Sequence, residues 1–401
     1  MSTQVCVAGG GPAGLMLGLL LARAGVPVAV LEKHSDFLRD FRGDTVHPST
    51  IRLLDRLGLT EKFLALPHRK VGQLRVIAGQ TTYQVADFSA LPLPYNYLAF
   101  LPQWDFLDFL ADEAAAYPHF TLLRSTEVTE LITEQGTVRG VRATSPDGPV
   151  EVAAELTVAC DGRDSDVRRL LGLTPREFGA PMDVLWFRLP RHDTDGDGLL
   201  MRIGAGQLML TIDRGDYWQI AYVIRKGGYE QVVARGLPAF REAVAGLDPE
   251  LADRVDQITD WDQVKMLTVQ VNRLRRWHAP GALMIGDAAH AMSPVGGVGI
   301  NLALQDAVAT ARLLAGPLRA GRLTEADLDR VRRRRRWPTV GTQLVQRLIQ
   351  RGMIGAVLSP GHEAAAPLPM RLANRLRPMR RMAARAVGFG LRPEYEAPPP
   401  A

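Results

Sequence analysis

The sequence predicts an α/β fold with three parts: a Rossmann-type dinucleotide-binding domain, an inserted and mostly antiparallel β-sheet domain, and a helical C-terminal segment. Three observations predict this organisation. The first 33 residues read as strand, glycine turn, helix and second strand. Two later apolar strands, ending near residues 160 and 285, are each followed by a pair of aspartate and glycine. Between them, residues 176–275 alternate apolar and polar side chains, as half-buried antiparallel strands do.

The first unit carries the pattern Gly9-x-Gly11-x-x-Gly14 between its strand and its helix. Gly9 allows a tight turn, Gly11 lets the backbone approach a pyrophosphate, and Gly14 lets the helix pack closely on the strand. The helix N-terminus adds free N–H groups and the positive end of a dipole for the phosphates. The expected strand, helix and second strand span Val5–Ala8, Pro12–Ala24 and Val28–Leu31.

The second strand ends in Glu32, eighteen residues after Gly14. A carboxylate at this position can accept a hydrogen bond from a ribose hydroxyl and would repel a 2′-phosphate. The unit is therefore predicted to bind an adenosine diphosphate group without a 2′-phosphate. A simple turn before a core helix would not need three glycines together with the acid.

Length, cysteine content and the lengths of the apolar runs limit the kinds of protein that the chain can be. The chain has 401 residues, 46% of them hydrophobic, which is enough for one large domain or two joined ones. Its two cysteines, Cys6 and Cys160, are interpreted as buried apolar residues rather than a redox pair, and so few cysteines suit a reducing cytosol. The longest apolar run, Leu15–Ala22, is too short to cross a bilayer, and the glycine turn interrupts any signal peptide. We expect a cytoplasmic protein without a metal site.

The excess positive charge, +5 overall, lies mainly late in the chain, in Arg332–Arg336 and between Arg371 and Arg392. Solvated helix faces are the favoured interpretation, and weak contact with an acidic partner or a membrane surface is the alternative. Aromatic residues do not interleave with these arginines, so no nucleic-acid platform is expected. The final residues, EAPPPA, are expected to be disordered.

The loop after Glu32 carries Arg42 and His47. A polar loop that leaves the second strand of such a fold lies beside the ligand crevice, so Arg42 is given a ligand-side role and His47 a weaker one. The alternative for each is a surface loop residue. Gln103, near the start of an expected helix at 101–116, could reach the ligand. Another helix is expected at about 49–57, and short strands at 74–78, 81–86, 121–123, 128–133, 138–143 and 156–160.

The second constellation follows the strand 156–160, which ends at Asp161-Gly162. Ser165 can cap a short helix that carries Arg168. In the third constellation, a strand at 282–285 ends at Gly286-Asp287, and a glycine-rich loop follows. A long helix then begins near Gly299, and its N-terminal N–H groups make a site for an anion or a carbonyl.

Residues 71–99 and 176–275 are expected to form a substrate-binding sheet domain, with a helix at about 229–244. The discontinuous dinucleotide-binding domain would comprise 1–70, 100–175 and 276–330, and residues 331–401 the helical C-terminal segment. Possible wall residues of a substrate pocket are Trp186, Leu200, Met209 and Tyr222. Plain sheet core is the favoured alternative for each of them.

Together the three constellations resemble the group-A FAD monooxygenases, the flavoprotein aromatic hydroxylases related to p-hydroxybenzoate hydroxylase. The resemblance spans most of the chain, with the motifs in the right order and spacing. The matching residues are Gly9, Gly11, Gly14 and Glu32 in the first motif, Asp161, Gly162, Ser165 and Arg168 in the second, and Gly286, Asp287, His290, Pro294, Gly297, Gly299 and Asn301 in the third.

The resemblance implies an FAD cofactor. Glu32 would bind the adenosine ribose, Asp287 the ribityl–pyrophosphate part, and the backbone of 299–301 the flavin pyrimidine edge. The Asp161-Gly162 stretch would serve both FAD and a transient nicotinamide. Pro294 would lie near the oxygen-reacting face, and Arg42 and Pro294 are the catalytic candidates. The expected FAD contacts are Gly9, Gly11, Pro12, Ala13, Gly14, Glu32, Lys33, Arg42, Gln103, Val128, Asp161, Gly286, Asp287, Pro294, Gly297, Gly299, Ile300 and Asn301.

The implied activity is hydroxylation of an aromatic or polycyclic small molecule by O₂ through a flavin C4a-hydroperoxide, with NADPH or NADH as a transient reductant. Gly204-x-Gly206 lacks a third glycine, so no dedicated nicotinamide domain is expected. A W-x-W-x-I-P motif is absent, which counts against flavin halogenases, and without a thioredoxin-like extension the chain looks like the shorter hydroxylase branch.

Two other functions stay open: an oxidase or reductase of the same fold, for example one that saturates prenyl chains, and a non-catalytic flavoprotein. His290 is predicted to be a structural residue that holds the glycine loop rather than a general base. A monomer and a homodimer are equally compatible with the sequence.

Overall fold

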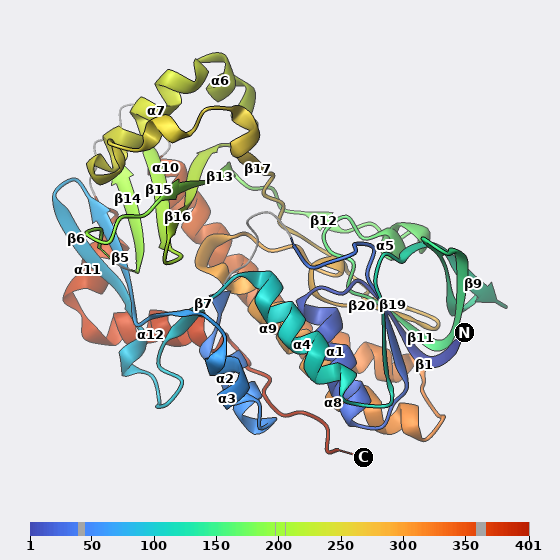
Figure 1. Cartoon of the computed structure of the whole chain (residues 1–401). Coiled ribbons are helices and arrows are strands. Elements are labelled where there is room, and N and C mark those ends of the chain that lie inside the picture. Colours follow the sequence, from blue (N-terminus) through green and yellow to red (C-terminus); the bar gives the residue numbers. More distant parts are fainter. Residues whose placement is uncertain (39–44, 197, 205, 358–365, 401) are drawn as a thin grey trace.

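The computed structural model describes residues 1–38, 45–196, 198–204, 206–357 and 366–400. It has two lobes, each built on its own large sheet, and C-terminal helices that lie along the second lobe (Figure 1). The chain enters the second lobe twice, first at residues 73–87 and again at 182–267.

The first lobe has a sheet with the strand order β19-β20-β11-β1-β2-β8, which is parallel from β20 to β8 and has β19 antiparallel at its edge. Its strands are β1 (Ser2–Ala8), β2 (Val28–Leu31), β8 (Phe120–Leu123), β11 (Gly148–Ala159), β19 (His278–Ala279) and β20 (Ala282–Met284), with β9 (Glu127–Glu134) and β10 (Thr137–Ser145) continuing antiparallel from β11. β1 pairs in parallel with both β2 and β11, and Val5 to Ala8 are buried. A strand covered on both faces is a continuous apolar run, which is why this segment could be predicted.

Helix α1 (Pro12–Arg23) packs against α4 (Gln103–Ala115) and α8 (Val298–Arg319). Pro12 occupies its first turn, where a missing N–H costs nothing, and Gly25 with φ +73° follows its end. The helix is apolar around its whole circumference because the sheet and the two neighbouring helices enclose it. The predicted strand–helix–strand unit is confirmed.

The second lobe has a sheet with the order β17-β13-β16-β15-β14-β5-β6, in which the pairing of β14 with β5 is parallel and the others are antiparallel. The predicted antiparallel layer is therefore confirmed. Helices α6 (Tyr229–Ala234) and α7 (Gly236–Leu247) cover one face. Its strands are β5 (Gln73–Ala78), β6 (Thr81–Asp87), β13 (Met182–Pro190), β14 (Leu199–Gly204), β15 (Gln207–Asp213), β16 (Tyr217–Arg225) and β17 (Lys265–Leu267).

Short strands and further helices complete the fold. The short strands are β3 (Thr45–Val46), β4 (Arg69–Val71), β7 (Leu98–Phe100), β12 (Arg176–Glu177) and β18 (Asn272–Arg273). The remaining α-helices are α2 (Pro48–Arg56), α3 (Thr60–Ala65), α5 (Asp166–Leu170), α9 (Glu325–Ile349), α10 (Gly355–Val357), α11 (Leu368–Arg375) and α12 (Arg377–Gly388). Single turns of 3₁₀ or π type lie at Phe88–Ala90, Pro249–Leu251, Val255–Gln257, Trp261–Gln263, Gly286–Ala288, Val295–Gly297 and Gln350–Ile354.

The helical stretch expected at 229–244 is confirmed, but it consists of two helices, α6 and α7. The break lies at Arg235 and Gly236, because Gly236, the first residue of α7, has φ +82°, which is outside the right-handed helical region. The turn lets α7 cross the sheet and bury Phe240 and Val244 against it.

The four possible wall residues of the substrate pocket lie on both faces of the sheet of the second lobe. Strand register pairs Leu200 with Thr211 and Met209 with Tyr222, which places all of them on the face under α7. Met209 and Tyr222 belong to the apolar core there, so the core alternative is confirmed for these two. Trp186 lies on the opposite face, where Val295 of the first lobe also packs.

The C-terminal tail packs on the fold. Pro398 is buried and its carbonyl oxygen accepts from Arg23 Nη1 at 3.2 Å, so the expectation of a disordered EAPPPA end is wrong for the residues described. Glu394 is buried and paired with Arg334 and with Arg312, 3.2 Å away. Tyr395 packs under Arg52, 4.1 Å from the ring centroid. The tail runs from α12 back past α2, and its composition gave no sign of these partners (Figure 1).

The arginine run 332–336 is only partly a solvated face. Arg335 is fully buried and its Nε donates to Asp306 Oδ1 at 2.8 Å. Arg332 and Arg333 pair with Asp329 on the same helix. Burial of Cys6 raises the pKa of its thiol to about 12, which agrees with its prediction as a core residue. Within the described ranges no helix is long and apolar enough to cross a membrane.

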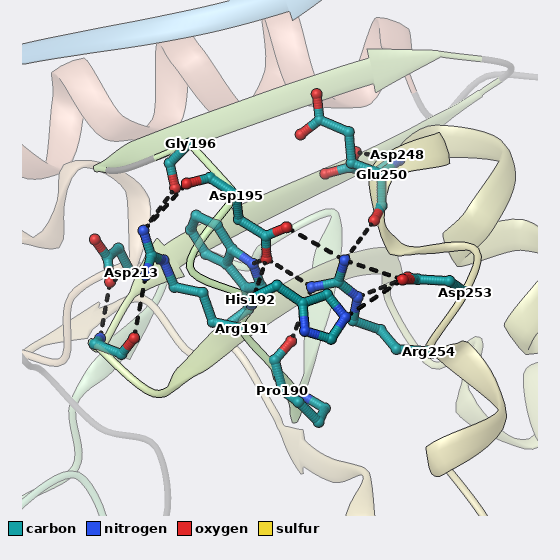
Figure 2. Close-up of polar contacts among 12 residues, drawn as sticks. Pro190, Arg191, His192, Asp195, Gly196, Asp213, Asp248, Glu250, Asp253 and Arg254 are labelled. Atoms are coloured by element: carbon teal, nitrogen blue, oxygen red, sulfur yellow. Dashed lines mark hydrogen bonds and ion pairs between the residues drawn. The ribbon is translucent and has the colours of Figure 1, made fainter.

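Polar contacts fix the loop that follows β13 (Figure 2). The Arg254 guanidinium donates to both oxygens of Asp195, at 2.6 and 3.2 Å. Trp218 Nε1 donates to Asp195 Oδ2 at 2.9 Å, and Arg191 donates to the carbonyl oxygen of Gly196 at 3.2 Å. This network lies in the sheet lobe, away from the three constellations, and its role is structural.

Candidate functional site

The glycine turn between β1 and α1 has the close contacts that its glycines predict. Gly9 has φ +103°, and a Cβ added there would lie 2.6 Å from the carbonyl oxygen of Cys160. A Cβ on Gly14 would lie 1.9 Å from the carbonyl oxygen of Gly9. A Cβ added to Gly11, the N-cap of α1, would meet no atom within 4 Å beyond its chain neighbours. The open position is thus the one predicted to meet a pyrophosphate, at a helix N-terminus.

Glu32 is buried beside the same turn. Its Oε2 accepts from the backbone N of Gly10 at 2.9 Å and its Oε1 from that of His34 at 3.0 Å. These two bonds orient the carboxylate beside the glycine turn.

Two other predicted contacts in this region do not converge on the turn. Lys33 extends to the surface, where its Nζ is 3.9 Å from Glu127 Oε1. Val128 packs in the apolar core behind the sheet with Leu131. Nothing in the positions of these two side chains indicates a cofactor contact.

The Asp161 motif packs directly against the glycine turn. Asp161 Oδ2 accepts from the backbone N of Val167 at 3.1 Å, and Oδ1 is buried without a hydrogen-bond partner in the described chain. Burial raises the pKa of Asp161 above its ordinary value, against the hydrogen bonds from Ser165 and Val167. A buried acceptor without a partner is uncommon, and a cofactor hydroxyl would satisfy it.

Arg168 joins the second motif to the third. Its Nη1 donates to the carbonyl oxygen of Ala288 at 3.1 Å and its Nη2 to that of Arg163 at 2.6 Å. Arg163 in turn has its Nη2 3.8 Å from Asp287 Oδ2. Ser165 accepts from the backbone N of Arg168 at 3.0 Å, which confirms the predicted cap of α5.

The third motif leads into the N-terminus of α8. Gly286 has φ +58° and packs so closely that a Cβ would lie 3.3 Å from Ala303 Cβ. Gly296 and Gly297 are both left-handed, with φ +78° and +62°, and Gly297 is the N-cap of α8. These conformations favour glycine and turn the chain sharply after Pro294. Gly299, Ile300 and Asn301 then form the first turn of α8, whose N–H groups have no partner within the helix.

The Asn301 side chain fixes α2 to α8. Its Oδ1 accepts from Ser49 Oγ at 2.6 Å and from Thr50 Oγ1 at 3.3 Å, and its Nδ2 is buried without a partner in the described residues. The side chain is a structural link, whereas the prediction concerned the backbone at 299–301.

His47 is neither a surface residue nor turned toward open space. The ring is fully buried, with Nδ1 2.8 Å from the carbonyl oxygen of Val387 and Nε2 3.0 Å from that of Gly297. Burial lowers the pKa of His47, although both carbonyls favour its protonated form. The imidazole therefore clamps the glycine loop to α12.

His290 is structural in position, but its partner differs from the one predicted. The ring packs at a tilt of 40° against Trp277, and its Nε2 is 2.6 Å from Asp306 Oδ2 in α8, instead of bonding to the glycine loop. The same carboxylate oxygen accepts from the backbone N of Gly286 at 3.1 Å, and Oδ1 accepts from Arg335. Burial would raise the pKa of Asp306, but the charges and hydrogen bonds of His290 and Arg335 lower it.

A row of glutamines on α9 and the π-helical turn that continues it was not predicted. Gln346 Nε2 donates to the carbonyl oxygens of Ser293 at 2.9 Å and Val295 at 2.8 Å, one on each side of Pro294. Gln343 holds the carbonyl oxygen of Ala291 at 3.1 Å, and Gln350 holds Ser293 Oγ at 2.8 Å. The signal in the sequence is the spacing 343, 346 and 350, which puts three amides on one helix face.

The structure thus brings together Gly9, Gly11, Pro12, Ala13, Gly14, Glu32, Asp161, Gly286 and Asp287. Ala303 of α8 packs against Gly286, so Pro294, Gly297, Gly299, Ile300 and Asn301 lead into a helix that adjoins this group. Gln103 is the first residue of α4 and directly follows β7, which pairs with β3. Arg42, the other catalytic candidate, lies outside the described residues.

These residues fit an FAD. The uncrowded Gly11, the unsatisfied oxygen on Asp161 and the N-terminus of α1 lie at the carboxyl ends of β1 and β11, where this kind of fold binds its ligand. The fold and site define a Rossmann-type flavoprotein. The sequence model of a family described as "FAD binding domain" matches residues 2–347, and the chain belongs to this family.

Similar proteins of known activity show which kind of flavoprotein this is. The chain is 36% identical over 392 residues to 6-methylpretetramide 4-monooxygenase of Streptomyces rimosus, covering 97% of this chain and 92% of the relative. It matches the structure of the anhydrotetracycline hydroxylase OxyS of Streptomyces rimosus with TM-score 0.74 and 26% identity, over 97% of this chain and 76% of that one. The flavin-dependent brominase Bmp2 shares the fold, with TM-score 0.77 and 17% identity over 97% and 94% of the two chains. The chain is an FAD-dependent monooxygenase.

Proposed function

We propose that this monooxygenase hydroxylates an aromatic or polycyclic small molecule with O₂, and that NADPH or NADH is the reductant. The names of two relatives state 6-methylpretetramide and anhydrotetracycline as substrates. FAD, when bound, would take electrons from the reductant and activate O₂. The remaining tasks of binding, orientation and exclusion of water fall to this chain.

The observation that carries the proposal is the position of the loop 294–297 between the lobes. Val295 packs against the core of the sheet lobe, while Val298 packs with Met292 and Leu302 of the first lobe. A substrate between the sheet and this loop would therefore lie beside the N-terminus of α8, where the backbone of 299–301 is proposed to meet the flavin. The positive end of the helix favours negative charge on a reduced ring.

Trp186 is the proposed substrate contact on the sheet. It lies on the face that Val295 shares, and its buried Nε1 has no hydrogen-bond partner among the described residues. An indole N–H can donate but cannot accept, so it would select a substrate carbonyl or hydroxyl oxygen. The ring itself offers an apolar wall to a flat molecule.

The test is to screen polycyclic and simple aromatic compounds against the FAD-loaded protein for stimulated oxidation of NADPH or NADH. We expect O₂ consumption and a product that gains one oxygen atom from ¹⁸O₂. A reductase would consume the reductant without incorporating oxygen, a brominase would require bromide, and a non-catalytic flavoprotein would show none of these reactions. Any of the three results overturns the proposal.

Four further expectations stay proposals: the FAD contacts residue by residue, the domain boundaries, a cytoplasmic location, and either a monomer or a homodimer. Weak contact with an anionic membrane is also kept as a proposal. Exposed Leu368, Leu372 and Met382 accompany the arginines of α11 and α12, and flotation with phosphatidylserine vesicles tests it.

A further inference from the structure

Three arginines from different segments surround one aromatic ring that is not part of the site at the carboxyl ends of β1 and β11. The guanidinium carbons of Arg347, Arg273 and Arg176 lie 4.9, 5.0 and 5.4 Å from the centroid of Phe178. Arg336 lies eleven residues before Arg347 on α9, which is three turns away on the same helix face. We call these four residues the arginine cluster.

The cluster is not neutralised by the described chain. None of its four side chains forms an ion pair with a described carboxylate, whereas Arg330, Arg332, Arg333, Arg334 and Arg335 of the same helix all do. Arg347 Nε is buried without a hydrogen-bond partner in the described chain, and Arg273 Nη1 donates to the neutral amide of Gln343 at 2.5 Å. Burial lowers the pKa of Arg273, and repulsion by the other three arginines lowers it further. Four like charges that share no carboxylate among the described residues create a positive potential, which favours the binding of an anion.

The cluster is attached to the backbone of the cofactor motifs. Phe178 N donates to the carbonyl oxygen of Val271 at 2.9 Å, and Asn272 N to that of Ala291 at 3.2 Å. Gln343 bonds to both Asn272 and Ala291, and to Arg273. The four arginines therefore lie one layer behind the chain that runs from Asp287 to Pro294.

We infer that the arginine cluster is a binding site for the phosphate groups of a small, mobile ligand. Guanidinium groups match phosphate oxygens with paired N–H donors, and three of them stacked on one ring are held in place before the ligand arrives. We identify this ligand as the dinucleotide reductant, which carries two or three phosphates; this identification rests on the proposed function. The chain has one glycine-rich phosphate turn, which FAD would occupy, so a transient dinucleotide needs another anchor.

The experiment uses the FAD-loaded protein and the double variant Arg176→Gln/Arg347→Gln, which leaves the Arg273–Gln343 hydrogen bond in place. Arg333→Gln, whose partner is Asp329, is the matched control. NADPH binding is measured from the concentration dependence of anaerobic flavin reduction, and 2′,5′-ADP binding by calorimetry. We expect the double variant to bind NADPH and 2′,5′-ADP at least roughly tenfold more weakly than the wild type, because two charge-assisted contacts are lost. The limiting rate of reduction and the FAD content should stay unchanged.

Unchanged binding of NADPH and of 2′,5′-ADP in the double variant overturns the inference. If neither NADPH nor NADH reduces the wild-type flavin, the proposed reductant is wrong, and loss of 2′,5′-ADP binding in the variant still supports the phosphate site. Loss of binding to phosphatidylserine vesicles with unchanged 2′,5′-ADP binding would assign the cluster to lipid headgroups and overturns it too. Should the double variant fail to fold, Arg336→Gln with Arg176→Gln tests the same surface from exposed positions.

Discussion

At the scale of single residues, three aspartates of the site have three different environments. Asp161 keeps a buried oxygen without a partner in the described chain, Asp306 is fully buried between a histidine and an arginine, and Asp287 is partly exposed beside Arg163. The unpartnered oxygen of Asp161 is available to a cofactor hydroxyl. Asp306 is saturated by protein donors and therefore acts on the site only by holding Gly286.

Asp287→Ala should weaken FAD binding because it removes an acceptor for cofactor hydroxyls. A hydrogen bond of this kind contributes about 1–3 kcal/mol, which is roughly a tenfold loss of affinity or more. Flavin fluorescence during titration of the apoprotein measures the affinity for FAD, with Asp147→Ala in an exposed turn as the control. Wild-type affinity in a folded Asp287→Ala protein would contradict this assignment.

His290→Asn should keep flavin reduction and most of the hydroxylation, and should lower thermal stability. The ring bonds to Asp306 in the interior and is 1% exposed, so it has no route to a substrate in the sheet lobe. Rapid-reaction kinetics and a thermal melt test both parts. Normal FAD binding and reduction with hydroxylation slowed about a hundredfold or more, the scale of a general base, would make His290 catalytic instead.

At the scale of elements, prediction succeeded where one local pattern determines the structure. The glycine turn, the Ser165 cap and the strand ends at 161 and 287 each depend on residues close together in sequence. The glutamines of α9 and the Asp306–Arg335 pair failed to be predicted because their partners lie 29 to 57 residues away. A polar residue on a helix could equally face water, and only the tertiary fold decides which carbonyl it meets.

Gln346→Leu should loosen the Pro294 loop, since it removes two hydrogen bonds and leaves the carbonyl oxygens of Ser293 and Val295 without that donor. Each lost bond costs about 1 kcal/mol. We expect a lower melting temperature and more hydrogen peroxide per NADPH oxidised, because a loose loop admits water to the reacting centre. Leu344→Ala, exposed on the same helix, is the control and should change neither. A tightly coupled Gln346→Leu enzyme would show that the loop is held by other contacts.

At the scale of the whole molecule, the C-terminal segment is hydrogen-bonded to parts of the fold that are far away in sequence. His47 joins α12 to the glycine loop, Gln305 donates to the carbonyl oxygen of Phe389 at 3.2 Å, and Arg335 donates to that of Arg392 at 3.1 Å. Composition predicted a disordered, proline-rich end, because it gives no sign of partners that are contributed by α1, α2, α8 and α9, far away in sequence.

Glu394→Ala should destabilise the protein by about 1–3 kcal/mol, whereas Glu396→Ala should change stability by less than about 0.5 kcal/mol. Glu394 is buried between Arg312 and Arg334, and its removal leaves two half-buried cations without their carboxylate. Glu396 is exposed, 3.5 Å from Arg56, where solvent screens the pair. Urea denaturation of both variants measures the difference, and equal values would mean that the tail is not part of the folded unit.

Acid should unfold the protein partly through Asp195. Burial alone would raise the pKa of this carboxyl, but the hydrogen bonds from Arg254, His192 and Trp218 lower it well below its ordinary value. A carboxyl whose pKa is lower in the folded state stabilises the fold fully above its unfolded pKa of about 3.9, and the stabilisation is lost as the pH falls below that value. The difference in unfolding free energy between wild type and Asp195→Asn should therefore be constant near pH 7 and shrink between about pH 5 and pH 2. Denaturant titrations across this range test it, with Asp147→Asn as the exposed control. A difference that is the same at every pH would show that the variant loses only neutral contacts, and that the ion pair of Figure 2 adds no charge-dependent stability.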